Sequence, residues 1–178
     1  MTTVSIAATV LLGWAVAAAP PADDDEWIGE RFMPRAGCVV KNGEKAIPLE
    51  RLVYPLVVSK VDGDRAWIGR GWVEKSQLVP WREAREYYAQ LVKEQPSSLS
   101  YFLRGVLRLE RYDIEEAASD FAEALRLDGK NTAALAYRGV ALGALEDDEN
   151  AAKCFDEAIK LDTRLNDFDL DGDPCPIA

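Results

Sequence analysis

The sequence predicts a mixed fold of two domains, a small all-β barrel followed by an all-α array of helical repeats. Residues 27–80 contain short runs of Val, Ile and aromatic residues separated by turn signals, a pattern typical of small barrels. Residues 98–165 repeat themselves, because 12 of 34 positions are identical after a shift of 34 residues. A fixed period of this length indicates stacked helical hairpins.

Composition excludes several classes of function. Residues 20–80 hold 9 Lys/Arg against 10 Asp/Glu, whereas the remainder from residue 81 holds 12 against 21. This acidic half repels phosphate, so we expect no nucleic-acid partner. Histidine is absent, which removes the commonest general base and metal ligand. Three scattered cysteines do not have zinc-site spacing. We therefore expect neither an enzyme nor a bound cofactor.

The first 19 residues carry no charge, and Val4–Ala19 is apolar apart from Ser5 and Thr9. This run is shorter than the roughly 20 residues that span a bilayer as a helix. It ends in small residues, so we expect residues 1–19 to be a signal peptide, with a signal anchor or a buried helix as alternatives. The protein would then be exported to the periplasm, to the cell surface or secreted into the medium. It would have no stable membrane span after removal of the signal. Residues 20–26 are polar and acidic and predict a flexible linker.

Five short strands are predicted in residues 27–80. Asn42-Gly43 and Asp62-Gly63-Asp64 are strong tight-turn signals, and Lys75–Gln77 predicts a single helical turn. The strands are expected at Arg31–Met33, Cys38–Lys41, Leu56–Val61, Arg65–Gly69 and from Gly71 to Val73.

The end of this segment resembles bacterial Src-homology-3-like barrels, through Gly71-Trp72-Val73 followed by Leu78-Val79-Pro80. Related barrels bind peptides or cell-wall glycans through exposed aromatic side chains. The resemblance therefore implies a binding role for tryptophans, the candidates being Trp27, Trp67, Trp72 and Trp81. The alternative is that two or three of them fill a very small core.

Helical periodicity begins at residue 81. Ala84, Tyr88 and Leu91 share one helix face, and Pro96 ends the helix. We interpret residues 81–97 as a half repeat, followed by full repeats at 98–131 and 132–165, and residues 166–178 as an acidic tail. The four helices of the full repeats are expected at Leu99–Glu110, Glu115–Leu127, Ala133–Leu145 and Asn150–Leu161, with Asp113 as an N-cap.

The two repeats share a ladder of small, large and small residues: Gly105, Ala117, Phe121 and Ala124, then Gly139, Ala151, Phe155 and Ala158. This ladder resembles the tetratricopeptide repeat over roughly residues 81–164. Barrel and repeats together resemble exported proteins of planctomycete type. In the repeat family the first helix of each pair lines a concave face that binds proteins or peptides. Matching positions place Leu99, Phe102, Val106, Leu109, Ala133, Ala136 and Val140 there.

These seven side chains are apolar and include no basic clamp for a carboxylate. We therefore expect a non-catalytic protein–protein interaction adaptor or scaffold that binds an apolar helix or extended segment. Some of the seven could instead pack against the barrel or a second copy of the chain. The alternative function is binding of cell-wall or surface glycan through the barrel.

The acidic tail contains a possible calcium loop. Asp167, Asp169 and Asp171 have the alternate spacing of calcium ligands, but the twelfth position is Ala178 where a bidentate Glu is needed. The favoured interpretation is therefore a disordered acidic tail, with a weak calcium site as the alternative. Cys154 is expected to be a buried thiol or to pair with Cys175.

Overall fold

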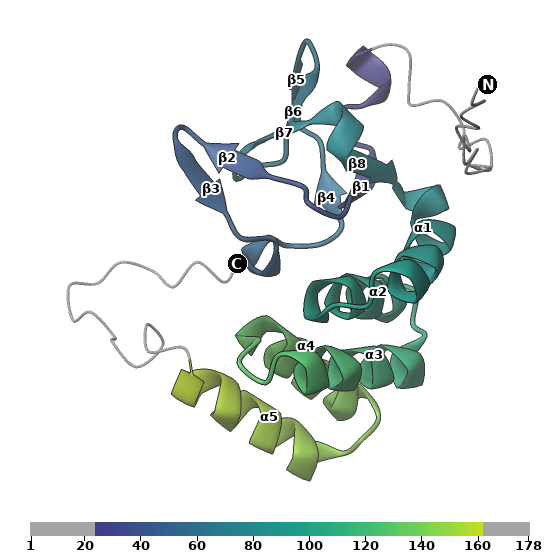
Figure 1. Ribbon diagram of the computed structural model, residues 1–178, viewed down its shortest axis with the longest axis vertical. Coiled ribbons are helices and arrows are strands. Elements are labelled where there is room, and N and C mark those ends of the chain that lie inside the picture. The colour runs from purple at the N-terminus through teal and green to yellow at the C-terminus, as the bar shows by residue number, and fades with distance from the viewer. Residues whose placement is uncertain (1–23, 162–178) are drawn as a thin grey trace, which may run out of the picture.

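The computed structural model describes residues 24–161, which form a β unit followed by five α-helices (Figure 1). The strands in this range are β1 (Arg31–Pro34), β2 (Val40–Asn42), β3 (Lys45–Ile47), β4 (Leu56–Val57), β5 (Lys60–Asp62), β6 (Arg65–Trp67), β7 (Trp72–Glu74) and β8 (Leu78–Pro80). The α-helices are α1 (Trp81–Glu94), α2 (Ser98–Glu110), α3 (Ile114–Leu127), α4 (Thr132–Ala144) and α5 (Asp148–Leu161). Three 3₁₀ turns are η1 (Asp24–Glu26), η2 (Leu49–Arg51) and η3 (Lys75–Gln77).

The strands form two antiparallel sheets, ordered β4-β1-β8 and β3-β2-β7-β6-β5. Gly43 and Gly63 lie in the β2–β3 and β5–β6 turns with φ of 60° and 57°, the left-handed values that tight hairpin turns require. Both predicted turns are therefore confirmed. The ladders of the described strands do not join the two sheets, so the expected closed barrel is seen as two sheets around a shared core.

Several details of this unit differ from the expectation. Strands β3 and β8 were not among the five predicted strands. The predicted strand Leu56–Val61 divides in two, because β4 pairs with β1 in one sheet and β5 pairs with β6 in the other. The expected linker ends in the η1 turn, where Asp24 forms an ion pair with Lys75.

The helices start and end within two residues of the predicted positions. Ser97 and Ser100 form a capping box before α2, and the Asn131 side chain accepts from Ala134 N at 2.9 Å before α4. Asp113 occupies the N-cap position of α3, but its side chain makes no cap hydrogen bond. The predicted position of the N-cap is therefore correct, but the hydrogen bond expected from its side chain is not formed.

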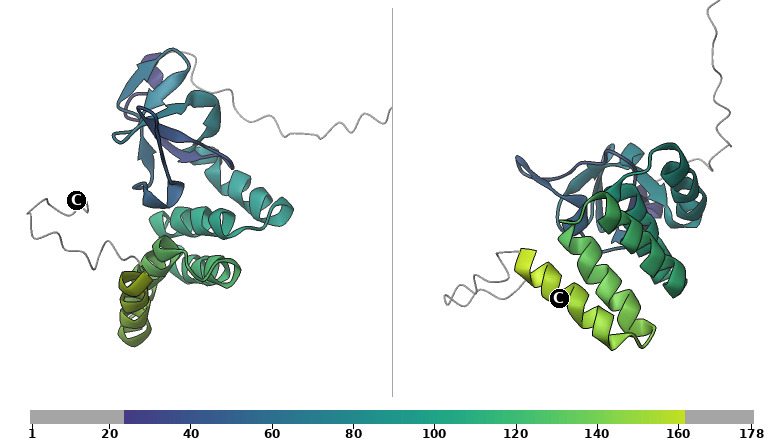
Figure 2. Two further views of the ribbon diagram at one scale, coloured as in Figure 1. Left: turned by 60° about the vertical axis from the view of Figure 1, so that its left-hand side comes forward. Right: turned by 60° about the horizontal axis from the view of Figure 1, so that its bottom comes forward.

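The β unit and the helices share one continuous core, which runs from Trp27 to Ala141. The Tyr88 hydroxyl donates to the carbonyl of Pro34, and Tyr54 meets the Phe102 ring edge-on at a centroid distance of 6.5 Å. The two predicted domains thus meet without a boundary in the core. Figure 2 shows the helices stacked away from the β unit, with α5 farthest from it. None of the described helices is long and apolar enough to cross a membrane.

Candidate partner-binding faces

Two of the predicted groove residues of the first repeat are buried within the chain. Phe102 and Val106, both predicted to line an open groove, have no exposed surface. Tyr54 lies against Phe102, and η2 contacts α4. Leu99 and Leu109 are half-buried against the core. Phe102 and Val106 are therefore core residues in this structure, which agrees with the alternative that part of this face packs on the barrel.

The second repeat leaves the equivalent positions open. Ala133 and Ala136 are half-buried, and Val140 is 51% exposed although its counterpart Val106 is fully buried. The predicted site thus divides between its two halves. The first half is filled from within the chain, and the second half remains accessible.

A second contrast between the repeats concerns two equivalent phenylalanines. Phe121 on α3 is fully buried, with the Tyr137 ring of α4 at a centroid distance of 5.8 Å. Phe155 on α5 is 38% exposed. Its ring is nevertheless held from one side, because a Cβ built on Gly139 would lie 2.8 Å from it. Phe155 therefore presents a positioned apolar surface, where Phe121 is covered by the next helix.

These observations define an end face, made of exposed residues of α4 and α5. The members are Val140, Ala152, Phe155 and Ile159. Matching of repeat positions predicts Val140 as a binding residue but does not predict the three residues on α5. The repeat pattern could have indicated them, because a large residue that packs between repeat units is exposed where no further helix covers it.

An ion cluster joins α2 to α3. Asp120, which is 2% exposed, accepts from Arg104 Nε at 2.8 Å and Nη2 at 2.6 Å, and from Arg108 Nη1 at 2.7 Å. These hydrogen bonds with Asp120 raise the pKa of Arg104. The second repeat has Cys154 in place of Asp120. Burial raises the pKa of this thiol, which is buried as predicted, while its possible partner Cys175 lies outside the described residues.

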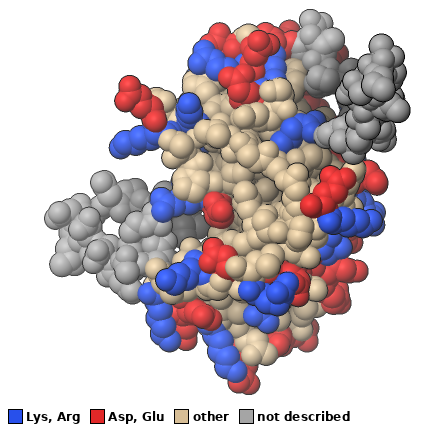
Figure 3. Space-filling model, in the orientation of Figure 1, with Lys and Arg blue, Asp and Glu red and all other residues tan. Residues whose placement is uncertain are grey.

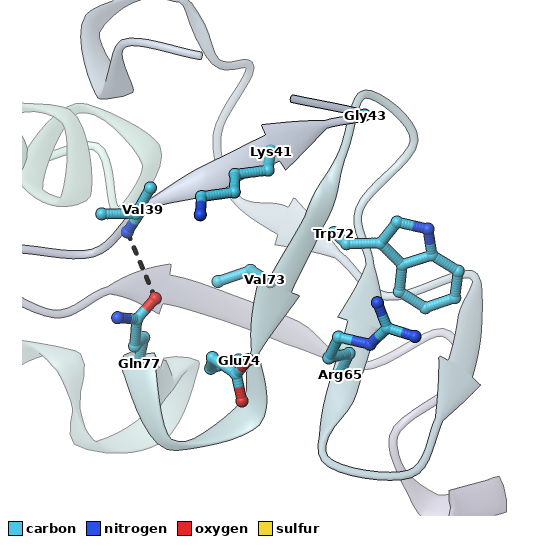
Figure 4. A pocket seen from close by; sticks show the side chains of 8 residues that line it. All are labelled: Val39, Lys41, Gly43, Arg65, Trp72, Val73, Glu74 and Gln77. Atoms are coloured by element: carbon cyan, nitrogen blue, oxygen red, sulfur yellow. Dashed lines mark hydrogen bonds between the residues drawn. The ribbon is translucent and has the colours of Figure 1, made fainter. Parts of the chain in front are cut away.

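A separate hollow of about 540 Å³ lies on the β unit (Figure 4). Trp72 forms one wall, with the Arg65 guanidinium 5.2 Å from its ring centroid. Trp67 packs edge-on against Trp72 at 5.5 Å, and both are half-buried. Trp27 instead is 2% exposed and stacks on Phe32. Of the tryptophan candidates, Trp72 therefore reaches the hollow, and Trp27 belongs to the core.

The described residues contain no cluster of three or more acidic or cysteine side chains suited to a metal ion. The calcium candidates Asp167, Asp169 and Asp171 lie outside the described residues.

No protein-family model matches the sequence, and the search of curated proteins found no match. Solved structures with a similar helical region are tetratricopeptide repeat domains. The second such domain of Spaghetti (RPAP3), bound to an HSP90 peptide, is 28% identical with a TM-score of 0.44, covering 46% of this chain and 76% of that one. The Arabidopsis OM64 domain is 28% identical with a TM-score of 0.45, covering 47% and 70%. The TPR2B domain of yeast Sti1, in its pHsp70 complex, is 23% identical with a TM-score of 0.45, covering 48% and 70%. Since these TM-scores are 0.45 or lower, the proposals below rest on the contacts of this chain.

Proposed function

We propose that this chain is a non-catalytic adaptor that binds a protein segment on its end face. The observation that carries the proposal is the different exposure of equivalent residues. Val106 and Phe121 are fully buried, while Val140 and Phe155 are 51% and 38% exposed. Repeat positions that normally receive a neighbouring helix are thus accessible in the second repeat.

The identity of the residues supports this choice of surface. Exposed aliphatic and aromatic side chains that lie together on a soluble protein commonly mark an interaction site. In the view of Figure 3, acidic and basic side chains are interspersed over the helical half. Apolar contact therefore supplies the main attraction in this proposal.

Site-specific photo-crosslinking tests this function. A photoreactive phenylalanine analogue replaces Val140, and a control chain carries it at Leu127, which is 42% exposed on α3 and lies outside the end face. Incubated with envelope extract of the native cell, the position-140 chain should form a defined crosslinked protein that the position-127 chain does not form. Identical crosslinks from both chains, or none from position 140, would refute the adaptor function.

We further propose that the adaptor works outside the cytoplasm, because the first 19 residues have the composition of an export signal. Mass spectrometry of the mature protein should find an N-terminus shortly before Pro20. Protein that retains Met1 in the native cell would contradict this localisation.

Glycan binding through a Src-homology-3-like β unit is the second candidate function. The half-buried pair of Trp67 and Trp72 beside an open hollow favours it, because sugars stack on accessible aromatic rings. Retention of the full chain on purified wall material should fall at least about tenfold in Trp72→Ala, which corresponds to a loss of about 1.4 kcal/mol. Val57→Ala, at an exposed residue that does not line the hollow, serves as the control. Equal retention of the two variants would remove this candidate.

A further inference from the structure

The end face has an acidic border that its counterpart in the first repeat lacks. By the 34-residue period, Asp148 corresponds to Ile114 and Asp156 to Ala122. Ile114 packs against the core and Ala122 is half-buried, whereas both aspartates are exposed. Two positions that are apolar in the first repeat, where the face is covered, are therefore carboxylates in the second repeat, where the face is exposed.

Helix geometry places these carboxylates beside the apolar residues. Asp148 lies four residues before Ala152 and seven before Phe155, and Asp156 lies three residues before Ile159, so all project to one side of α5. Among the described residues, neither aspartate has a basic side chain within ion-pair distance. Helix α5 carries two lysines: Lys153 binds Glu149 at 2.6 Å, and Lys160, four residues after Asp156, forms no ion pair with it.

The first repeat shows what kind of element fits such a face. There the α4 helix covers Phe121, with Tyr137 packed against the rings of Phe121 and Phe102. An occupant of the end face should therefore be a helix with an aromatic residue directed at Phe155. Its flanks should carry positive charge to meet Asp148 and Asp156.

We propose that the end face binds a basic amphipathic helix of another protein, an inference that rests on the adaptor function above and specifies its partner. Charge complementarity selects this occupant over the alternatives. A second copy paired through α5 would bring the same aspartates together. The chain's own residues 162–178 contain five Asp and one Arg, so they too have the wrong sign. Head-to-tail stacking of copies is also disfavoured, because the β unit covers the other end of the array (Figure 2).

A pair of helix-stapled, fluorescein-labelled peptides tests the proposal against the full chain. Both copy α4 from Thr132 to Ala144 and keep Tyr137. One carries lysine and the other glutamate at four flanking positions, those of Ala133, Arg138, Val140 and Leu142. By fluorescence anisotropy at low salt, the lysine peptide should bind about tenfold more tightly than the glutamate peptide. The difference should shrink in 0.5 M salt, roughly as expected from a Debye length of a few ångströms.

Variants of the chain locate the effect. Asp148→Asn with Asp156→Asn should remove most of the lysine preference. The control pair Glu115→Gln with Glu116→Gln, at exposed acids of α3, should keep it. Phe155→Ala should weaken the lysine peptide at least about tenfold, and the exposed Val140→Ser repeats this test if Phe155→Ala disturbs folding.

Equal binding of the two peptides, binding of neither, or a preference that survives in the double Asn variant overturns the basic-helix proposal. A dimer of the chain in light scattering that Phe155→Ala dissociates overturns it in favour of a second copy. Stronger binding after truncation at Leu161 would show that the chain's own tail competes for the face, and would equally overturn it. In each case the crosslink from position 140 still decides the adaptor function separately.

Discussion

At the scale of single residues, Asp120 is the clearest point at which one side chain fixes the geometry of the first hairpin. It is buried and accepts hydrogen bonds from Arg104 and Arg108. Asp120→Ala should lower the free energy of unfolding by about 2 to 3 kcal/mol, below the full cost of an orphaned buried charge, because both arginines can reach water. Urea unfolding measures this loss.

Asp120→Asn keeps the shape and removes the charge, so its loss should be smaller. Asp156→Asn, at an exposed position, should change the free energy of unfolding by less than about 0.5 kcal/mol. A loss from Asp120→Ala no larger than that of Asp156→Asn would show that the ion cluster does not stabilise the fold.

Two buried tyrosines predict a stability limit at alkaline pH. Burial raises the pKa of Tyr54 and Tyr88 well above their ordinary values, and their hydroxyls donate to the carbonyls of Leu49 and Pro34. Since the folded pKa values are raised, this stabilisation is fully present below the unfolded pKa of about 10 and is lost as pH rises above it. Absorbance at 295 nm follows the ionisation of tyrosine as the pH rises.

Tyr54 and Tyr88 should ionise only together with unfolding, seen as a simultaneous loss of far-ultraviolet circular dichroism. Tyr88→Phe should remove one ionisation from that step. Ionisation of Tyr54 and Tyr88 while the helices remain folded would contradict the burial of these two.

At the scale of elements, two equivalent glycines should respond differently to the same change. A Cβ at Gly105 would lie 2.7 Å from the Phe121 ring, and one at Gly139 would lie 2.8 Å from the Phe155 ring. Phe121 is fully buried and cannot move away, whereas the partly exposed Phe155 can rotate outward. Gly105→Ala should therefore destabilise the protein by about 1 to 3 kcal/mol.

Gly139→Ala should stay within about 1 kcal/mol of the parent chain, because the gain in helix propensity offsets the cost of moving the ring. Thermal unfolding of the two variants side by side makes the comparison. Equal losses would mean that Phe155 is held as firmly as Phe121, and that the end face is more rigid than its exposure indicates.

Local pattern predicted the helices better than the strands. The spacing of Ala84, Tyr88 and Leu91 gives a helix phase that needs no tertiary information, so each helix was located to within two residues. The strand β3 has no such signal, because Lys45–Ile47 is short and has no buried residue. The alternating pattern of residues 56–61 predicts one strand. The segment divides into two strands because its two parts pair with strands of different sheets.

At the scale of the whole molecule, the candidate site was predictable only in part. Matching of repeat positions placed Phe102 and Val140 on one concave face. Tyr54 of the β unit contacts Phe102 from 48 positions earlier in the chain, and no periodicity in the sequence reveals that contact. The exposure of Phe155 likewise depends on whether another helix packs on α5, and the repeat pattern alone does not predict this.

The shared core of the β unit and the helices predicts that they unfold in one transition. The described tryptophans lie in the β unit or at the start of α1, so tryptophan fluorescence reports on that part, while circular dichroism at 222 nm reports mainly on the helices. Because Tyr88 and Phe102 join both parts in one core, the two signals should give the same urea midpoint. If the β unit and the helices had separate cores, the two signals would give different urea midpoints.

The contact of Tyr54 with Phe102 allows a sharper form of this test. Tyr54→Ala removes a buried ring between the two parts and should lower the common midpoint, with a loss of about 3 to 5 kcal/mol. Val53→Ala changes the adjacent side chain, which is 70% exposed, and should leave the midpoint unchanged. Two probes that separate in the parent chain would show that the β unit and the repeats are independent domains. In that case the concave face of the first repeat, and not the end face alone, would be available to a partner whenever the β unit moves away.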